Sequence, residues 1–177
     1  FLAEYVLRLP LGWILKTKFK HTRTIAQRTG REYLSNLIRS LAPQRKVTFV
    51  AHSLGAYMLY DLFSKPQDYP FHNRIDDVIL LGGALSELKK DWRRTKFRTL
   101  INVYNPDDTI LGSLWPIGKA VDLENPISPY GRKAIKADIL SGNENIDISH
   151  IVGDSHSKYH EVFSRGILKY RRQKWVL

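Results

Sequence analysis

The chain contains no cysteine, and this absence excludes several kinds of chemistry. Without thiols there is no disulfide, no thiolate metal site and no cysteine nucleophile. The sequence also lacks a zinc-binding His-Glu-x-x-His motif and a glycine-rich phosphate loop. We therefore expect neither a metal nor another cofactor.

Long hydrophobic runs are missing as well. The nearest candidate for a membrane span, YVLRLPLGWIL at 5–15, is shorter than the roughly 18 residues that a bilayer requires, and Arg8 and Pro10 interrupt it. The chain begins at Phe1, and no signal-peptide pattern follows. We expect a fragment of a longer polypeptide, truncated at its N-terminus.

What is present suits one globular domain. The 177 residues are 43% hydrophobic and 25% charged, which is typical of a folded chain with its own core. The net charge of +11 lies at the two ends. Residues 1–46 carry ten Lys/Arg against two acids, residues 158–177 carry six against one, and the middle is close to neutral.

Basic ends of this kind suit an anionic surface. The stretch WILKTKFKH at 13–21 mixes aromatic and basic residues, a combination that fits an anionic membrane or a nucleic-acid backbone. No nucleic-acid-binding motif accompanies the charge, which disfavours nucleic acid. The plain alternative is a solvated face, or a segment that docks on a partner.

Apolar runs rich in β-forming residues predict the strands, at 47–51, 78–82 and 100–104, with a weaker fourth run at 145–152. The first three do not alternate polar with apolar residues, which indicates strands buried on both faces of a parallel sheet.

Helical periodicity predicts the remaining elements. The amphipathic segment 30–42 precedes the first strand, and another helix follows that strand. A closing helix is predicted over 157–170, with Ser155 or Ser157 as its N-cap. Glycines and prolines make 106–142 loop-rich, with short helical pieces.

The order of these elements predicts an α/β fold with a mainly parallel sheet flanked by helices. We divide the chain into a basic N-terminal segment, 1–29, and a folded domain, 30–177, in which 106–142 forms a lid-like insertion.

The stretch VTFVAHSLGAYMLY at 47–60 runs from a buried strand through a serine into a helix. A nucleophile elbow requires this context, with small residues two before and two after the nucleophile. Ala51 and Gly55 occupy those positions around Ser53. The tight turn exposes the serine hydroxyl and directs the N–H of Leu54 toward a developing oxyanion. The alternative is a serine that only caps the helix.

A serine nucleophile needs a base, and the base needs an acid to orient it. In this arrangement the chain order is serine, acid, histidine. Asp107 and Asp108 follow the strand at 100–104 and the turn-forming pair Asn105-Pro106. Both cannot face one histidine, and we choose Asp108, leaving Asp107 in the turn.

Three histidines lie downstream of the acid. His150 falls inside the predicted last strand and His160 inside the last helix, where structural or surface roles are usual. His156 lies in a short loop between the two elements, so we choose it as the base. His52 is next to the serine, but we expect its side chain to point away from the catalytic face.

With Ser53, Asp108 and His156 selected, the sequence resembles the α/β-hydrolase superfamily, and AHSLGA resembles the elbow of serine lipases and esterases. The segments RIDDVILLGG, NVYNPDDTIL and NIDISHIVGDSHSKY, in this order, resemble the transmembrane-and-coiled-coil-domain family, whose hydrolase-like domain is membrane-associated in its eukaryotic members. The resemblance covers roughly residues 30–170. It implies an α/β-hydrolase-like fold, with Ser53 as nucleophile, Asp108 as orienting acid and His156 as base.

The chain departs from this resemblance in two places. The family pattern around the histidine is Gly-His-x-x-Tyr, whereas Ser155 precedes His156 here and Tyr159 completes the pattern. Nothing before residue 47 resembles the strand and His-Gly type loop that give these hydrolases a second oxyanion donor. Either the protein extends upstream of Phe1 and the donor lies there, or the fold is minimal, or the domain has lost activity, and we favour the first alternative.

The leading hypothesis is therefore a serine hydrolase that cleaves carboxylic esters, with lipid-like substrates and a cytoplasmic or membrane-peripheral location favoured. Apolar residues of the loop-rich stretch would form a lid or would pack in the core: Leu111, Leu114, Trp115 and Ile117. The alternative is a non-catalytic interaction domain of the same fold, recruited to membranes or a partner by its basic ends.

Overall fold

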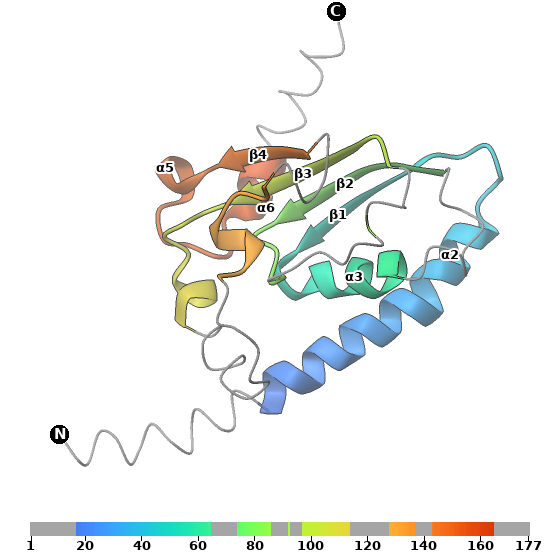
Figure 1. The fold of residues 1–177 in the computed structure, drawn as a ribbon, viewed down its shortest axis with the longest axis horizontal. Helices are drawn as coiled ribbons and strands as arrows, with labels where there is room; N and C mark the ends of the chain where they lie inside the picture. The colour runs from blue at the N-terminus through green and yellow to red at the C-terminus, as the bar shows by residue number, and fades with distance from the viewer. Residues whose placement is uncertain are drawn as a thin grey trace, which may run out of the picture.

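A four-stranded sheet forms the centre of the molecule (Figure 1). The computed structural model describes residues 17–64, 74–85, 92, 97–113, 128–136 and 143–164. The strands are β1 (Val47–His52), β2 (Ile75–Leu81), β3 (Thr99–Tyr104) and β4 (Asn143–Asp147). They lie in the order β1-β2-β3-β4, and every neighbouring pair is parallel. The predicted α/β class and parallel sheet are confirmed.

The inner strand β2 is buried on both faces except at Asp76, as its continuous apolar run predicts. It begins at Ile75, three residues before the predicted start, although Asp76 and Asp77 are polar. Arg98 makes this possible because its guanidinium lies 3.1 Å from Asp76 Oδ2 and 2.8 Å from Asp77 Oδ2. A buried carboxylate such as Asp77 needs such a partner.

The prediction of a fourth strand over 145–152 is wrong in its second half. The strand ends at Asp147, and α5 (Ser149–Val152) follows it. The Asp147 carboxylate accepts the N–H of Ser149 at 2.9 Å, which turns the chain out of the extended conformation. Ile148 and Val152 are four residues apart and both pack in the core, so their spacing suits a helix.

The N-terminal helix begins well before the predicted residue 30. The chain is helical over 17–29, continues through the π-helical segment η1 (Gly30–Leu34) and ends in α2 (Ser35–Ser40). Gly30 does not mark a boundary, because a Cβ there would clash with the backbone of Met58 in α3 (Ala56–Ser64). The glycine lets the two helices pack closely.

Two apolar clusters cover the two faces of the sheet, and neighbouring residues of the inner strands β2 and β3 alternate between them. On one face α3 lies next to the sheet, and the N-terminal helix packs against α3 (Figure 1). On the other face lie α5 and α6 (Tyr159–Val162). The first cluster includes Phe49, Ala51, Val78, Leu80 and Leu100, and the second includes Ile79, Leu81, Ile101, Val103 and Tyr159.

The stretch 106–142 is described only in part. Residues 109–113 form a helical turn, and η6 (Tyr130–Arg132) is a short 3₁₀ helix. Leu111 packs in the first apolar cluster, so it contributes to the core. The other proposed lid residues, Leu114, Trp115 and Ile117, lie outside the described residues.

The predicted closing helix begins at Tyr159, and its part after residue 164 lies outside the described residues. The prediction that Ser155 or Ser157 caps it is wrong. Lys158 is the N-cap residue, and the two serine hydroxyls lie 3.3 Å apart and bond to each other. Among the helices that the structure describes, none is long and apolar enough to cross a bilayer.

Candidate active site

Ser53 lies at the junction of β1 and the helical segment that follows it. The 3₁₀ turn η2 (Ser53–Gly55) connects the strand directly to α3. Ser53 has φ +52°, and it is the only residue other than glycine with a positive φ in the part of the chain that the structure describes. A serine in this left-handed conformation is strained, as in a nucleophile elbow.

The residues around the turn are small for a visible reason. A Cβ on Gly55 would lie 4.0 Å from the Cβ of Ala51, which is an ordinary contact. Alanine would therefore fit at position 55 as well. The carbonyl of Ser53 also accepts the N–H of Ala84 at 3.1 Å, which ties the turn to the loop after β2.

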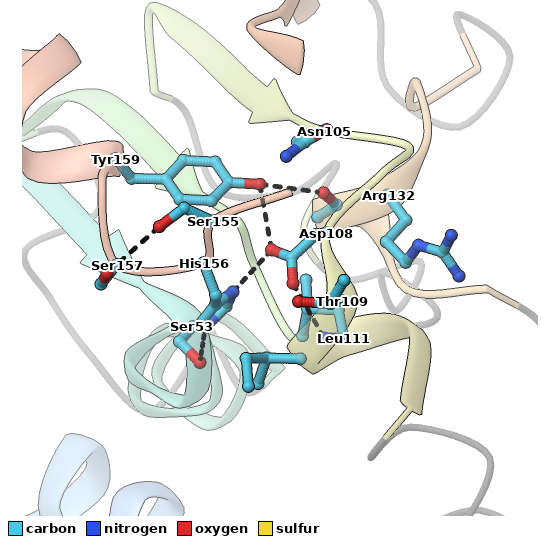
Figure 2. Close-up of polar contacts among 12 residues, drawn as sticks. Ser53, Asn105, Asp108, Thr109, Leu111, Arg132, Ser155, His156, Ser157 and Tyr159 are labelled. Carbon is cyan, nitrogen blue, oxygen red and sulfur yellow. Dashed lines mark hydrogen bonds and ion pairs between the residues drawn. The ribbon is translucent and has the colours of Figure 1, made fainter. Parts of the chain in front are cut away.

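His156 connects the serine to an acid (Figure 2). Its Nε2 lies 2.8 Å from Ser53 Oγ, and its Nδ1 lies 2.6 Å from Asp108 Oδ2. The carboxylate can only accept, so Nδ1 carries the proton and donates it to Asp108. Nε2 is then the acceptor for the serine hydroxyl. The three side chains come from positions separated by 103 and 48 residues, and the structure brings them together as the sequence predicts.

Asp108 is completely buried, and both of its oxygens are bonded. Oδ1 accepts the N–H of Leu111 at 2.9 Å, so the aspartate also caps the helical turn at 109–113. Oδ2 accepts from His156. The neighbouring Asp107 is exposed in the turn, as expected, and its N–H bonds to the side chain of Asn105.

Asn105 is a site residue that the sequence identifies only as a turn former. Its side chain is buried and donates to the carbonyl of Gly153 at 2.7 Å. Thr109 adds two bonds, from its N–H and its hydroxyl, to the carbonyl of Asp154 at 3.2 Å. The loop that carries the acid is thus bonded to the loop that carries His156.

Tyr159 is a second residue whose role the sequence does not reveal. Its ring is buried, and its hydroxyl lies 3.3 Å from Asp108 Oδ2 and 3.3 Å from the carbonyl of Gly131 (Figure 2). Burial and the nearby Asp108 carboxylate raise the pKa of Tyr159, so the phenol keeps its proton and acts as a donor. In the sequence, the one indication that Tyr159 belongs to the site is its place at the end of the Gly-His-x-x-Tyr pattern.

The expectation that His52 points away from the site is wrong. Its ring centroid lies 4.8 Å from that of His156, and its Nε2 lies 3.0 Å from the His156 carbonyl oxygen. Strand alternation explains this placement, because Ala51 faces the first cluster and His52 therefore faces the side of α6. His160 is exposed on α6 with its ring edge-on to His52, and His150 is exposed on α5.

Leu54 lies in the first helical turn after Ser53. The N–H groups of a first turn have no acceptor within their own helix, so that of Leu54 can serve an incoming oxygen. Within the described ranges, no group of three or more His, Asp or Glu side chains is arranged to hold a metal ion.

Comparison with known proteins gives a family and two distant relatives. The profile of a family described as "Protein of unknown function (DUF726)" matches residues 6–171. The chain is 28% identical over 138 residues to the transmembrane and coiled-coil domain-containing protein STS1 of Oryza sativa subsp. japonica, an alignment covering 76% of the chain and 20% of the relative. It is 25% identical over 159 residues to the uncharacterized membrane protein C6F6.13c of Schizosaccharomyces pombe (strain 972), covering 85% of the chain and 19% of that protein. The chain thus spans about a fifth of the length of these relatives. No solved structure matches it.

Proposed function

This chain belongs to the DUF726 family, and we propose that it is a serine hydrolase that cleaves carboxylic esters. One observation carries the proposal, namely the continuous hydrogen-bond chain from Ser53 Oγ through His156 to Asp108, with distances of 2.8 and 2.6 Å. A serine that only caps a helix would need neither the histidine nor the strained backbone at φ +52°.

In the proposed reaction Ser53 Oγ attacks the acyl carbon while His156 Nε2 takes the hydroxyl proton. The resulting imidazolium donates Nδ1–H to Asp108, which stabilises its charge. The protonated Nε2 then delivers the proton to the leaving alkoxide, and an acyl-serine remains. Water, activated by the same nitrogen, attacks this ester and releases the carboxylic acid, which restores the serine.

The tetrahedral intermediate carries a negative charge on the former carbonyl oxygen, and we assign the N–H of Leu54 as one donor to it. The remaining features that support an α/β-hydrolase-like fold are the all-parallel sheet, the positive φ of Ser53 and the chain order serine, aspartate, histidine.

We further propose lipid-like esters as the substrate class, with the chain bound peripherally to an anionic membrane. The names of both relatives include a membrane term, "transmembrane" in one and "membrane protein" in the other. The N-terminal helix also exposes apolar side chains, among them Ile25, Tyr33 and Leu37, in a segment with ten Lys/Arg against two acids over residues 1–46. Sedimentation with vesicles of anionic and of neutral lipids tests the preference for an anionic membrane. Equal binding to both kinds of vesicle, or binding to neither, would contradict it.

Covalent labelling with a fluorophosphonate tests the hydrolase itself, because the reagent reacts with activated serines. The natural polypeptide that contains this chain is labelled, digested and mapped by mass spectrometry. We expect one adduct on Ser53, absent from Ser53→Ala and strongly reduced in His156→Ala.

Two matched variants serve as controls. Ser113→Ala removes an exposed hydroxyl, and His150→Ala removes an exposed imidazole, both outside the site. Each should be labelled on Ser53 like the unsubstituted protein. A folded protein without a Ser53 adduct would overturn the hydrolase proposal and would favour the non-catalytic interaction domain.

A further inference from the structure

His52 is the last residue of β1 and directly precedes the serine of the site. Its imidazole is half-buried among three aromatic rings, at centroid distances of 4.8 Å to His156, 5.7 Å to Tyr159 and 4.7 Å to His160. The mechanism proposed above makes no use of this ring, although it is in contact with the base.

The hydrogen bond of His52 goes to the backbone of the base itself. Its Nε2 lies 3.0 Å from the carbonyl oxygen of His156. A carbonyl oxygen only accepts, so Nε2 of His52 carries the hydrogen and donates it. Within the described residues, the His52 ring is the only donor to this carbonyl.

The segment that carries His156 needs such an anchor. It is a short loop between α5 and α6 in which Ser157 and Lys158 are exposed. The early residues of this loop are bonded to the segment that carries Asp108, where Asn105 and Thr109 donate to the carbonyls of Gly153 and Asp154. The backbone at His156 is bonded instead to β1, the strand that ends at Ser53.

We infer that His52 is a positioning residue, which fixes the His156 backbone relative to β1 and so holds Nε2 within bonding distance of Ser53 Oγ. The inference rests on the proposed function, since it assigns to His52 a part in placing the base. A loop displaced by an ångström would lengthen the 2.8 Å contact on which proton transfer depends.

The state of the ring suits this role. Burial lowers the pKa of His52, so the ring is neutral at neutral pH. A neutral ring can approach His156 closely, whereas a charged one would repel the imidazolium that forms when His156 takes the serine proton.

Two substitutions distinguish the hydrogen bond of His52 to the His156 carbonyl from the packing of the His52 ring. His52→Phe keeps an aromatic ring but removes the donor, and His52→Gln keeps an N–H donor at a similar reach. We expect the fluorophosphonate labelling rate of Ser53 to fall about tenfold in the phenylalanine variant, which is the loss expected for one positioning contact of about 1.4 kcal/mol. The glutamine variant should recover most of the rate. His150→Phe, on the exposed face of α5, is the matched control.

A second measurement does not depend on catalysis. The proton between His156 Nδ1 and Asp108 gives a far-downfield proton NMR signal when the histidine is held in place. We expect this signal to be broadened or lost in His52→Phe and retained in His52→Gln, with urea midpoints confirming that both variants fold.

The outcomes of the two proposals are distinguishable. An unlabelled natural protein with an intact downfield signal that depends on His52 would overturn the hydrolase and leave the positioning role in place. A phenylalanine variant with the natural labelling rate and signal, or a glutamine variant as defective as phenylalanine, would overturn the role of His52.

Discussion

The phenolic hydroxyl of Tyr159 lies 3.3 Å from Asp108 Oδ2, the same carboxylate oxygen that accepts the Nδ1–H of His156 at 2.6 Å. The two residues are 51 positions apart, and both are completely buried. Tyr159 therefore contacts the acid from α6, the helix that directly follows the loop of the base.

Replacing Tyr159 with phenylalanine should weaken the site without opening the core. The ring is retained, and one hydrogen bond to a carboxylate is lost, which corresponds to about 1 kcal/mol or about a fivefold lower labelling rate of Ser53. Labelling kinetics measure the effect. Tyr33→Phe, at an exposed position, is the control, and an equal rate in both variants would contradict a role for the Tyr159 hydroxyl.

Replacing Asp108 with asparagine should nearly abolish activity. An amide in place of the carboxylate favours the wrong tautomer of His156, and the expected loss in esterase turnover is about 10⁴-fold. Asp107→Asn is the matched control, because the neighbouring carboxylate lies exposed in the turn. Comparable losses in both variants would show that the choice between the two aspartates is wrong.

The strained backbone at Ser53 predicts that glycine is more stabilising than alanine at this position. In an ordinary helix the order of the two residues is the reverse. Both substitutions remove the hydroxyl, but only glycine accepts φ +52° without strain, so Ser53→Gly should be more stable than Ser53→Ala by about 1 kcal/mol. Urea unfolding measures the difference. At the exposed helical position Thr22 the order should reverse, with alanine more stable by about 1 kcal/mol. The same order at both positions would contradict the strain.

The lowered pKa of His52 predicts a contribution to acid destabilisation. Burial is the main cause of the lowered pKa, and the charges of His156 and His160 lower it further. The hydrogen bond to the His156 backbone and the charge of Asp108 act in the opposite direction. Tyr159 is the remaining titratable group that contacts the ring. In unfolded chains histidine titrates near 6.5, so as pH falls below that value the unfolded state binds a proton that the folded state still excludes. Folding stability then decreases, whereas above that value this group has no effect.

Urea midpoints at about pH 7.5 and about pH 5.5 test this contribution, since these values lie on the two sides of the ordinary histidine pKa. The drop between them should be smaller in His52→Gln than in the natural protein. An unchanged or larger drop in the His52→Gln variant would show that His52 does not contribute to the loss of folding stability at low pH.

The sequence predicts the core of the site because each part of it has a local cause. The small residues around Ser53 and the apolar run before it indicate the elbow, and Asp108 and His156 follow later strands. The carboxyl ends of parallel strands meet at one edge of a sheet, so residues there lie close together. This reasoning places three side chains without knowledge of their contacts.

Local patterns fail where a residue acts through a distant neighbour. Gly30 resembles a helix boundary, and only its contact with Met58 reveals a packing glycine. The run at 145–152 is apolar enough for a strand, and the side chain of Asp147 decides in favour of a helix after it. His52 belongs to the motif, but its partner lies 104 residues further along the chain.

The sequence by itself determines the parallel sheet and the turn at Ser53, because burial and backbone sterics act between near neighbours along the chain. Tertiary structure decides which titratable groups meet at that turn. Asp107 and Asp108 share one turn, and His52 and His156 are 104 residues apart in the sequence. Their contacts depend on packing between α5, α6 and the sheet, which bonds Asn105 to Gly153, Tyr159 to Asp108 and His52 to His156.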